Sequence, residues 1–187
     1  MRTIVTLIFF TVISNTCWSL EIGGIEMPST LETGNQKTLE LNGAGIRNKW
    51  FIDLYVAGLY LPQPSQEASK ILDSDEPMAI RLHIISGMIN SKKLTNATEE
   101  GFKNSTGGNT EPFADNIERF LGQFKDEISE GDVFEFIYQP ASGVTVSKND
   151  GPSQLIDCDF NFKKALFGIW LSDKPAQKSL KESMLNL

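Results

Sequence analysis

The sequence has few residues that could bind a metal ion or form a disulfide bridge. Its 187 residues include two cysteines, Cys17 and Cys158, and one histidine, His83, which lies in an apolar stretch. Soft ligands are therefore too scarce for a conventional zinc site. If Cys17 is removed with the leader described below, Cys158 has no partner, and a small buried thiol is its commonest role. We expect no metal ion, no cofactor, and a fold held together by an ordinary hydrophobic core.

Positive charge is also scarce. The chain has 17 basic against 24 acidic residues, a formal net charge of −7, and no basic run offsets this balance. Loss of the leader would also remove Arg2, which leaves 16 basic against the same 24 acidic residues. A phosphate backbone would be repelled by such a surface, so we expect no nucleic-acid partner. The sequence does not indicate whether a protein partner uses the acidic surface.

Long hydrophobic runs are absent except at the amino end. Ile4–Ile13 is apolar, follows the single charge of Arg2, and precedes small and polar residues that end at Ser19. This pattern predicts a secretory signal peptide over residues 1–19, cleaved after Ser19, and a single domain over residues 20–187. A buried amino-terminal strand or helix is the alternative. No second run approaches the ~20 residues of a membrane span, so we expect no stable membrane insertion after cleavage.

Apolar periodicity and turn residues predict an α+β fold. Strands are predicted at 22–30, 37–41, 51–61, 78–85, 132–138, 144–147 and 153–158, and helices at 65–72, 91–104, 113–124, 160–171 and 176–185. The last strands form an antiparallel meander, and Asn42–Gly45 is predicted to be a turn because its glycines permit unusual backbone angles. Residues 51–61 are apolar at both odd and even positions, which predicts a central strand covered on both faces. Helices packed on an antiparallel sheet are therefore expected.

Four segments carry a resemblance to a known family. GAGIR at Gly43–Arg47 and FIDLYVAGLYL at Phe51–Leu61 resemble the start of the chalcone isomerase-like family, including its exported bacterial branch. GDVFEFIYQPASGVTV at Gly131–Val146 and FKKALFGIWLSDKP at Phe162–Pro175 are similar to its later meander and its terminal helix. The resemblance covers most of residues 21–187. It implies an open-faced sandwich, in which helices cover one face of a large antiparallel sheet, and a periplasmic location.

The same resemblance implies a ligand site between sheet and helices. In the family an arginine and a strand hydroxyl face the ligand, and Arg47 and Tyr55 match these two positions. A guanidinium presents a planar fork to a carboxylate, and a phenol can donate to the same oxygen. Trp50, Phe51 and Leu59, together with Leu54, are expected to surround these two groups with apolar surface. The alternative is that Arg47 caps a turn and Tyr55 belongs to the core.

The resemblance does not extend to the groups of the cyclising enzymes in the family. Their tyrosine and asparagine come from the helix after the middle strand, but residues 91–104 contain no tyrosine and Asn96 lies too early. Their late hydroxyl corresponds to a position near Ile169. An oxyanion-binding group without a placed base or nucleophile supports binding rather than turnover. We expect no catalytic residues.

Three functions remain open at this stage. The leading one is a periplasmic, non-catalytic binder of a fatty acid or similar small amphiphile, whose head group Arg47 and Tyr55 hold. The second is an isomerase or lyase acting on an enone or phenolic substrate. The third is a structural or interaction protein whose cleft is filled by its own side chains. The position of Arg47 and the packing around it separate the first function from the third.

Overall fold

A seven-stranded antiparallel sheet, in which the strands follow one another in chain order, forms the centre of the protein. The computed structural model describes residues 20–34, 37–149 and 151–187; the predicted signal peptide lies outside them. The strands of the sheet are β3 (Thr30–Glu32), β4 (Thr38–Lys49), β5 (Ile52–Leu61), β6 (Met78–Ile84), β7 (Val133–Gln139), β8 (Gly143–Lys148) and β9 (Gln154–Ile156). A separate hairpin consists of β1 (Leu20–Ile22) and β2 (Ile25–Met27).

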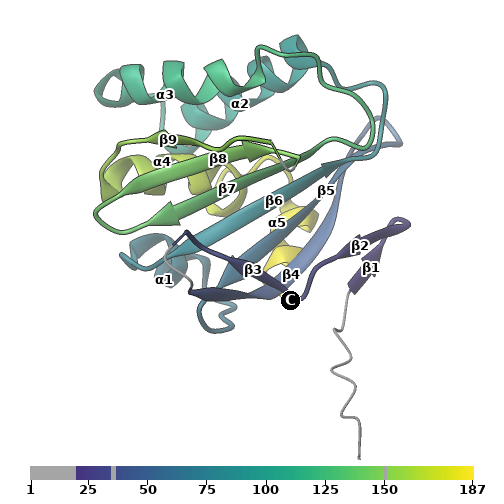
Figure 1. Cartoon of the computed structure of the whole chain (residues 1–187), viewed down its shortest axis with the longest axis horizontal. Helices are drawn as coiled ribbons and strands as arrows, with labels where there is room; N and C mark the ends of the chain where they lie inside the picture. Colours follow the sequence, from purple (N-terminus) through teal and green to yellow (C-terminus); the bar gives the residue numbers. More distant parts are fainter. Residues whose placement is uncertain (1–19, 35–36, 150) are drawn as a thin grey trace, which may run out of the picture.

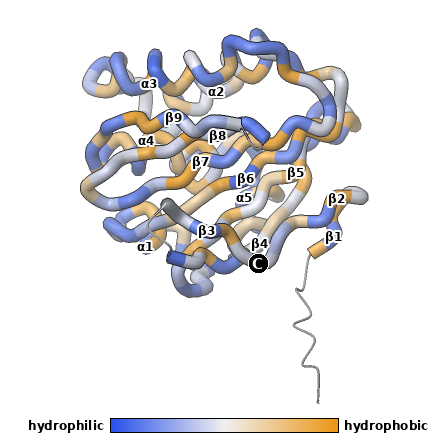
Figure 2. The backbone as a smooth tube through the Cα atoms, in the orientation of Figure 1, coloured by the Kyte–Doolittle hydropathy of each residue, from blue (hydrophilic) through white to orange (hydrophobic). Residues whose placement is uncertain are grey.

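The helices lie on one face of this sheet, as Figure 1 shows. They are α1 (Ala68–Asp73), α2 (Ser91–Ser105), α3 (Ala114–Leu121), α4 (Phe160–Leu171) and α5 (Lys178–Met184), with short 3₁₀ turns η1 (Glu111–Phe113) and η2 (Gly122–Phe124) on either side of α3. In Figure 2, hydrophilic and hydrophobic residues alternate along α2 and α3, as expected of helices that bury one side and expose the other. In α4, residues 162–163 and 165–171 are all buried. This arrangement confirms the predicted α+β open-faced sandwich.

Strand β5 is covered on both faces, as its uninterrupted apolar sequence predicts. Tyr55, Ala57 and Leu59 point to the helix side, where they join the large core cluster. Val56 and Tyr60 point to the opposite side, where β1–β3 and neighbouring strands contribute a smaller cluster that includes Met27, Leu31 and Leu39. Because the side chains of a strand alternate between faces, one segment contributes to both cores.

The prediction of a turn at Asn42–Gly45 is wrong, because these residues lie inside β4. Gly43 and Gly45 are required for another reason, which is the close approach of α5. A Cβ atom on Gly43 would lie 2.4 Å from the carbonyl oxygen of Ser183, and one on Gly45 would lie 2.6 Å from the Ser183 Cβ. The glycines of β4 therefore fix where α5 packs on the sheet.

The chain reverses at Trp50 and Phe51 instead. Lys49 pairs with Ile52, so Trp50 and Phe51, which lie between them, form a two-residue hairpin turn between β4 and β5. Both have positive φ, 53° and 66°, as a type I′ turn requires. Bulky residues occupy this region at a cost of roughly 1–2 kcal/mol each, and Asn-Gly is the usual choice. The sequence carries no turn signal here, which explains why the turn is predicted eight residues too early.

Two helix starts follow their capping residues. The Asn90 side chain accepts a hydrogen bond from the Lys93 backbone N–H at 3.0 Å, and Asp159 accepts one from Phe162 at 2.9 Å. Each satisfies a backbone donor that the first turn of a helix leaves free. The cap of α2 confirms the predicted start of that helix. Among the described residues, no helix has the length and hydropathy needed to cross a bilayer.

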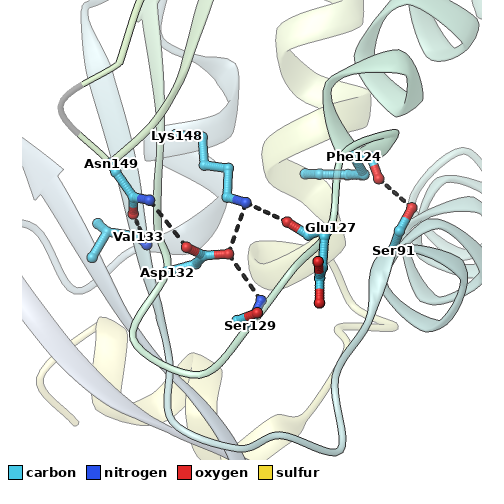
Figure 3. Close-up of polar contacts among 8 residues, drawn as sticks. All are labelled: Ser91, Phe124, Glu127, Ser129, Asp132, Val133, Lys148 and Asn149. Atoms are coloured by element: carbon cyan, nitrogen blue, oxygen red, sulfur yellow. Dashed lines mark hydrogen bonds and ion pairs between the residues drawn. The ribbon is translucent and has the colours of Figure 1, made fainter.

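An ionic network fastens the segment that enters β7 (Figure 3). The Asp132 carboxylate accepts hydrogen bonds from the Ser129 backbone at 2.9 Å and the Asn149 amide at 3.0 Å, and it pairs with Lys148 at 2.8 Å. Burial works to raise the pKa of Asp132, but these hydrogen bonds and the Lys148 charge outweigh burial and lower it.

Ser91 donates to the Phe124 carbonyl, which ties the start of α2 to η2.

Candidate functional site

Arg47 and Tyr55 lie side by side at the interface between the sheet and the helices. They are direct partners in the β4–β5 register, so their side chains share one face of the sheet. That face is the helix side, because Tyr55 belongs to the large core cluster. The structure therefore brings together the two residues expected to hold a head group. Arg47 is half-buried and Tyr55 is buried.

Gln177, the residue that precedes α5, holds the Arg47 side chain. Its Oε1 accepts hydrogen bonds from Arg47 Nη1 at 2.8 Å and from the Asn48 backbone N–H at 3.0 Å. Nη1 also donates to the Asn48 carbonyl. These contacts use one nitrogen of the guanidinium fork. Gln177 is not recognisable from sequence, because only the packing of α5 on the β4 glycines brings it within reach of Arg47.

No carboxylate neutralises Arg47 within the described part of the chain. The five ion pairs formed by described residues, at N–O distances up to 4.0 Å, involve other cations. Asp53 lies two positions before Tyr55 on the same strand and is exposed, but it forms no ion pair with Arg47. A half-buried guanidinium without a counter-charge is electrostatically costly, and an added anion would relieve that cost.

The Tyr55 phenol is neutral and has a proton to donate. Burial raises its pKa, while the hydrogen bond from Trp170 and the charge of Arg47 lower it by smaller amounts. The Trp170 indole donates to the Tyr55 hydroxyl at 3.2 Å. An indole N–H is only a donor, so Tyr55 acts as the acceptor in this bond. The phenol O–H thus remains able to donate to an anion beside Arg47.

The interior next to Tyr55 is apolar and filled. Leu59 is fully buried on the same face of β5 and belongs to the large core cluster. The Trp170 ring stacks on Phe136 with centroids 6.1 Å apart, and its indole N–H donates to the Tyr55 hydroxyl. The remaining buried aromatic residues of the large core cluster are Phe102, Phe120, Phe124, Phe134, Tyr138, Phe162 and Phe167. Trp170 is itself buried, so its ring occupies part of the interior beside Tyr55.

Trp50 and Phe51 do not join this site, although we expected them to surround the head group. Trp50 is 81 % exposed and Phe51 is fully exposed at the tip of the β4–β5 hairpin. The displacement follows from the misplaced turn, because β4 continues through its glycines and carries these two residues beyond the edge of the packed core. Leu54 is partly buried and packs against the large cluster.

Hollows open elsewhere on the helix side. A groove of about 660 Å³ lies between α2 and α3, and its apolar walls include Phe102, Ile117 and Leu121. A second hollow, of about 500 Å³, lies beside α4 and includes Phe113 and Lys164. Neither is lined by Arg47 or Tyr55. Sequence reasoning did not find them, because they arise between helices that the chain places side by side only on folding.

The other candidates for chemistry do not form a constellation. Burial raises the pKa of the Cys158 thiol to about 11, so little thiolate is present at neutral pH. Burial and the nearby Arg81 charge lower the pKa of His83, which lies on β6. Ile169 is buried where the cyclising enzymes have a hydroxyl, and Asn96 is exposed on α2.

The sequence matches a known family, and the fold resembles that of solved structures. The sequence matches the chalcone isomerase-like family over residues 19–186. Solved structures similar to this one include the crystal structure of a fatty-acid binding protein from Arabidopsis thaliana, with a TM-score of 0.69 and 20 % sequence identity. The alignment covers 90 % of this chain and 96 % of that chain. At that identity the likeness shows the fold. Curated protein sequences give no significant match.

Proposed function

The chain belongs to the chalcone isomerase-like family, and from this premise we propose that it binds a fatty acid or a similar small amphiphile without catalysing a reaction. The observation that carries the proposal is the unneutralised Arg47 guanidinium beside the neutral Tyr55 phenol. The Arabidopsis protein with the same fold is a fatty-acid binding protein, which supports this class of ligand. The head group would be a carboxylate.

The geometry supports two charge-assisted contacts to that carboxylate. Arg47 uses Nη1 for Gln177 and Asn48, and its other donors can bind one or both carboxylate oxygens. Tyr55 can donate its O–H to the same group while it still accepts from Trp170. Hydrogen bonds to charged groups are worth about 1.5–3 kcal/mol, so two such contacts are sufficient to orient the ligand.

The apolar tail would enter the interior past Trp170. Leu59 and the aromatic core provide the surface that a hydrocarbon chain requires. Because the Trp170 indole is buried and hydrogen-bonded to the Tyr55 hydroxyl, it would have to move aside before the tail could enter. Trp170 is then the gate of the site, held closed by a 3.2 Å hydrogen bond and by stacking on Phe136.

Binding without turnover agrees with the groups around Arg47. Among the described residues, the two positions that correspond to groups of the cyclising enzymes supply no proton donor or acceptor beside Arg47, because Ile169 is apolar and the Asn96 amide is exposed on α2. We also propose that the protein acts in the periplasm, on the strength of the leader pattern at residues 1–19. In that compartment it would carry or sense an amphiphile.

Titration calorimetry with a long-chain fatty acid tests the binding proposal. We expect micromolar or tighter binding by the wild type and a loss of at least tenfold for Arg47→Ala. Arg47→Lys keeps the charge but lacks the fork, so it should recover part of the affinity. Lys49→Ala, which removes a nearby exposed cation from the same strand, is the matched control. The absence of binding, or equal affinity in Arg47→Ala, would contradict the proposal.

One observation favours a second candidate, an interaction protein whose cleft is permanently filled. Trp170 packs over Tyr55 and joins a continuous aromatic core. The variant Trp170→Phe separates the two functions, because it keeps most of the packing and removes the hydrogen bond. If Trp170 is a gate, the variant should bind the fatty acid at least as tightly as the wild type. If the cleft is permanently filled, neither protein should bind it.

A further inference from the structure

The tip of the β4–β5 hairpin exposes three large apolar residues in succession. Trp50 is 81 % exposed, Phe51 is fully exposed, and Ile52 is 39 % exposed. The other large exposed apolar residues of the described chain are separate from one another in sequence: Leu20, Met88, Leu155 and Leu187. Single exposed apolar residues are ordinary on protein surfaces, whereas a cluster that includes two aromatic rings calls for an explanation.

A second hairpin in the same chain shows that the turn itself does not require aromatic residues. Ile22 pairs with Ile25, so Gly23 and Gly24 form a two-residue turn between β1 and β2. Their φ values of 60° and 77° resemble the 53° and 66° of Trp50 and Phe51. Glycine adopts this conformation without strain, and aromatic residues do not. The β4–β5 turn thus combines backbone strain with exposed apolar surface, a pairing that is typical of functional sites.

The size and shape of the tip suit a bilayer better than a protein surface. An aromatic side chain can bury about 150–250 Å². Two rings therefore provide roughly 300–500 Å², which is below the ~800 Å² per partner of a stable protein interface. The two-residue tip is convex, and a soft medium can accommodate such a protrusion without a matching pocket. Tryptophan is also enriched at the level of lipid head groups.

The charges around the tip are compatible with anionic lipid. Lys49 is exposed directly before the turn, and Lys92 and Lys93 are exposed at the start of α2. The loop from β6 to α2, with exposed Met88, lies at the same end of the sheet because Ile85 bonds to the Leu54 carbonyl; Figure 1 shows this loop beside the hairpin turn. Asp53 and Glu130 are exposed there too. Asp126 and Glu127 are exposed just after Phe124, to which the start of α2 is bonded, so lysines and acids are mixed at this end and Lys49 is the cation directly beside the tip.

We propose that Trp50 and Phe51 insert into the interfacial layer of a phospholipid bilayer and dock this end of the sheet on the membrane surface. Insertion of these rings would remove their apolar surface from water, and the neighbouring lysines would remain at the level of the lipid phosphates. The inference does not depend on ligand binding. It does place Arg47, three residues before Trp50, close to the membrane surface.

Flotation with vesicles of phosphatidylcholine and phosphatidylglycerol tests the proposal. Trp50→Asn with Phe51→Gly installs the turn sequence preferred at these backbone angles, so the double variant should be at least as stable as the wild type to thermal unfolding. We expect the double variant to bind the vesicles at least tenfold more weakly than the wild type. Leu155→Ser, which removes an exposed apolar residue from β9, is the matched control and should bind like the wild type.

Both the full chain and a chain that begins at Leu20 should be compared, because the apolar run at residues 4–13 could itself bind lipid. The proposal expects the double variant to lose binding in both backgrounds. It also expects Trp50 fluorescence to shift to shorter wavelength with vesicles and to be quenched by brominated lipid. No vesicle binding by the chain that begins at Leu20, or equal binding by wild type and a stably folded double variant, would overturn the proposal. In either case a protein partner would be left as the occupant of the tip.

Discussion

Lys163 and Arg47 are two cations withdrawn from water in the same protein, but their surroundings differ. Lys163 is 0 % exposed, and its Nζ donates to the carbonyls of Ile71, Leu72 and Ser74 at 2.7, 3.1 and 2.7 Å. These carbonyls belong to the carboxyl end of α1, where a cation is favoured by the helix dipole. An ammonium group has three donors, and all three are used.

Arg47 is less deeply buried and less completely satisfied. One of its nitrogens bonds to Gln177 and Asn48, and no carboxylate among the described residues lies within ion-pair distance. It faces the amino end of α5, where the dipole offers a cation no stabilisation. The comparison shows that burial alone does not mark a binding site. A cation whose donors are all used by the fold is structural, whereas one with spare donors and no counter-charge can receive an anion.

The largest expected effect on stability is for the removal of the Lys163 charge, and it tests whether Lys163 and Arg47 differ as described. In Lys163→Met the side chain keeps its approximate length and loses its donors, which leaves three carbonyls without their partner. We expect a loss of about 3 kcal/mol in the free energy of unfolding, measured by urea denaturation. Arg47→Met is the matched control and should cost less than about 1 kcal/mol, because Arg47 is only half-buried. Equal losses in the two variants would remove the distinction.

The pH dependence of stability in the wild type and Lys163→Met tests the burial of the Lys163 charge. Burial lowers the pKa of Lys163 from 10.5 to about 8, although Asp75 draws it upward. The unfolded chain therefore binds the proton more tightly between these values, and stability should rise with pH across this window. Wild type should gain stability relative to Lys163→Met between pH 7.5 and pH 10. A constant difference, or one that shrinks, would indicate that burial does not penalise the charged form.

The next effect is on ligand affinity, and it is expected when the charge of Arg47 is satisfied within the protein, as the charge of Lys163 is. Gln177→Glu places a carboxylate on the atom position that already accepts from Arg47 Nη1. The guanidinium then has a counter-charge within the protein, and fatty-acid affinity should fall at least tenfold by calorimetry while stability is kept or raised slightly. Gln123→Glu, on the outer side of the molecule at η2, adds the same charge and should leave affinity unchanged. Unaltered affinity in Gln177→Glu would contradict the role of Arg47.

The smallest expected effect is a change in fatty-acid affinity caused by the charge of Asp53, which lies near Arg47. Asp53 lies on the same face of β5 as Tyr55 and repels an anion at Arg47 through partly screened solvent. Asp53→Asn should therefore raise the affinity for a fatty-acid anion about twofold to threefold at low salt. The gain should disappear at high ionic strength. An uncharged amphiphile such as a fatty alcohol should show no gain at any salt concentration.

Sequence reasoning succeeds here where the determinants are local. The apolar residues of β5 at both odd and even positions predict its central place, and apolar periodicity predicts the helix over 91–104, because such periodicity is set within a few residues. It places the first turn wrongly, since Gly43 and Gly45 serve the approach of α5, which is about 140 residues away in the chain. That error also misplaces Trp50 and Phe51.

The candidate site is predictable only in part. The family resemblance points to Arg47 and Tyr55, and the register brings them together. Gln177 and the gate formed by Trp170 carry no local signal, because both reach the site through the packing of α4 and α5. Leu59 is buried in the core, and its burial does not distinguish a ligand wall from an ordinary core position, so its contact with a ligand stays a prediction.

The most direct measurement of the central claim is the pKa of a bound fatty acid whose carboxyl carbon is labelled with ¹³C. A carboxylate held by the Arg47 guanidinium and the Tyr55 hydroxyl should stay ionised to lower pH than the same fatty acid free in solution, and Arg47→Ala should abolish this shift in pKa. An unshifted or raised pKa for the bound carboxyl in the wild type would show that the head group lies elsewhere, and it would contradict the account.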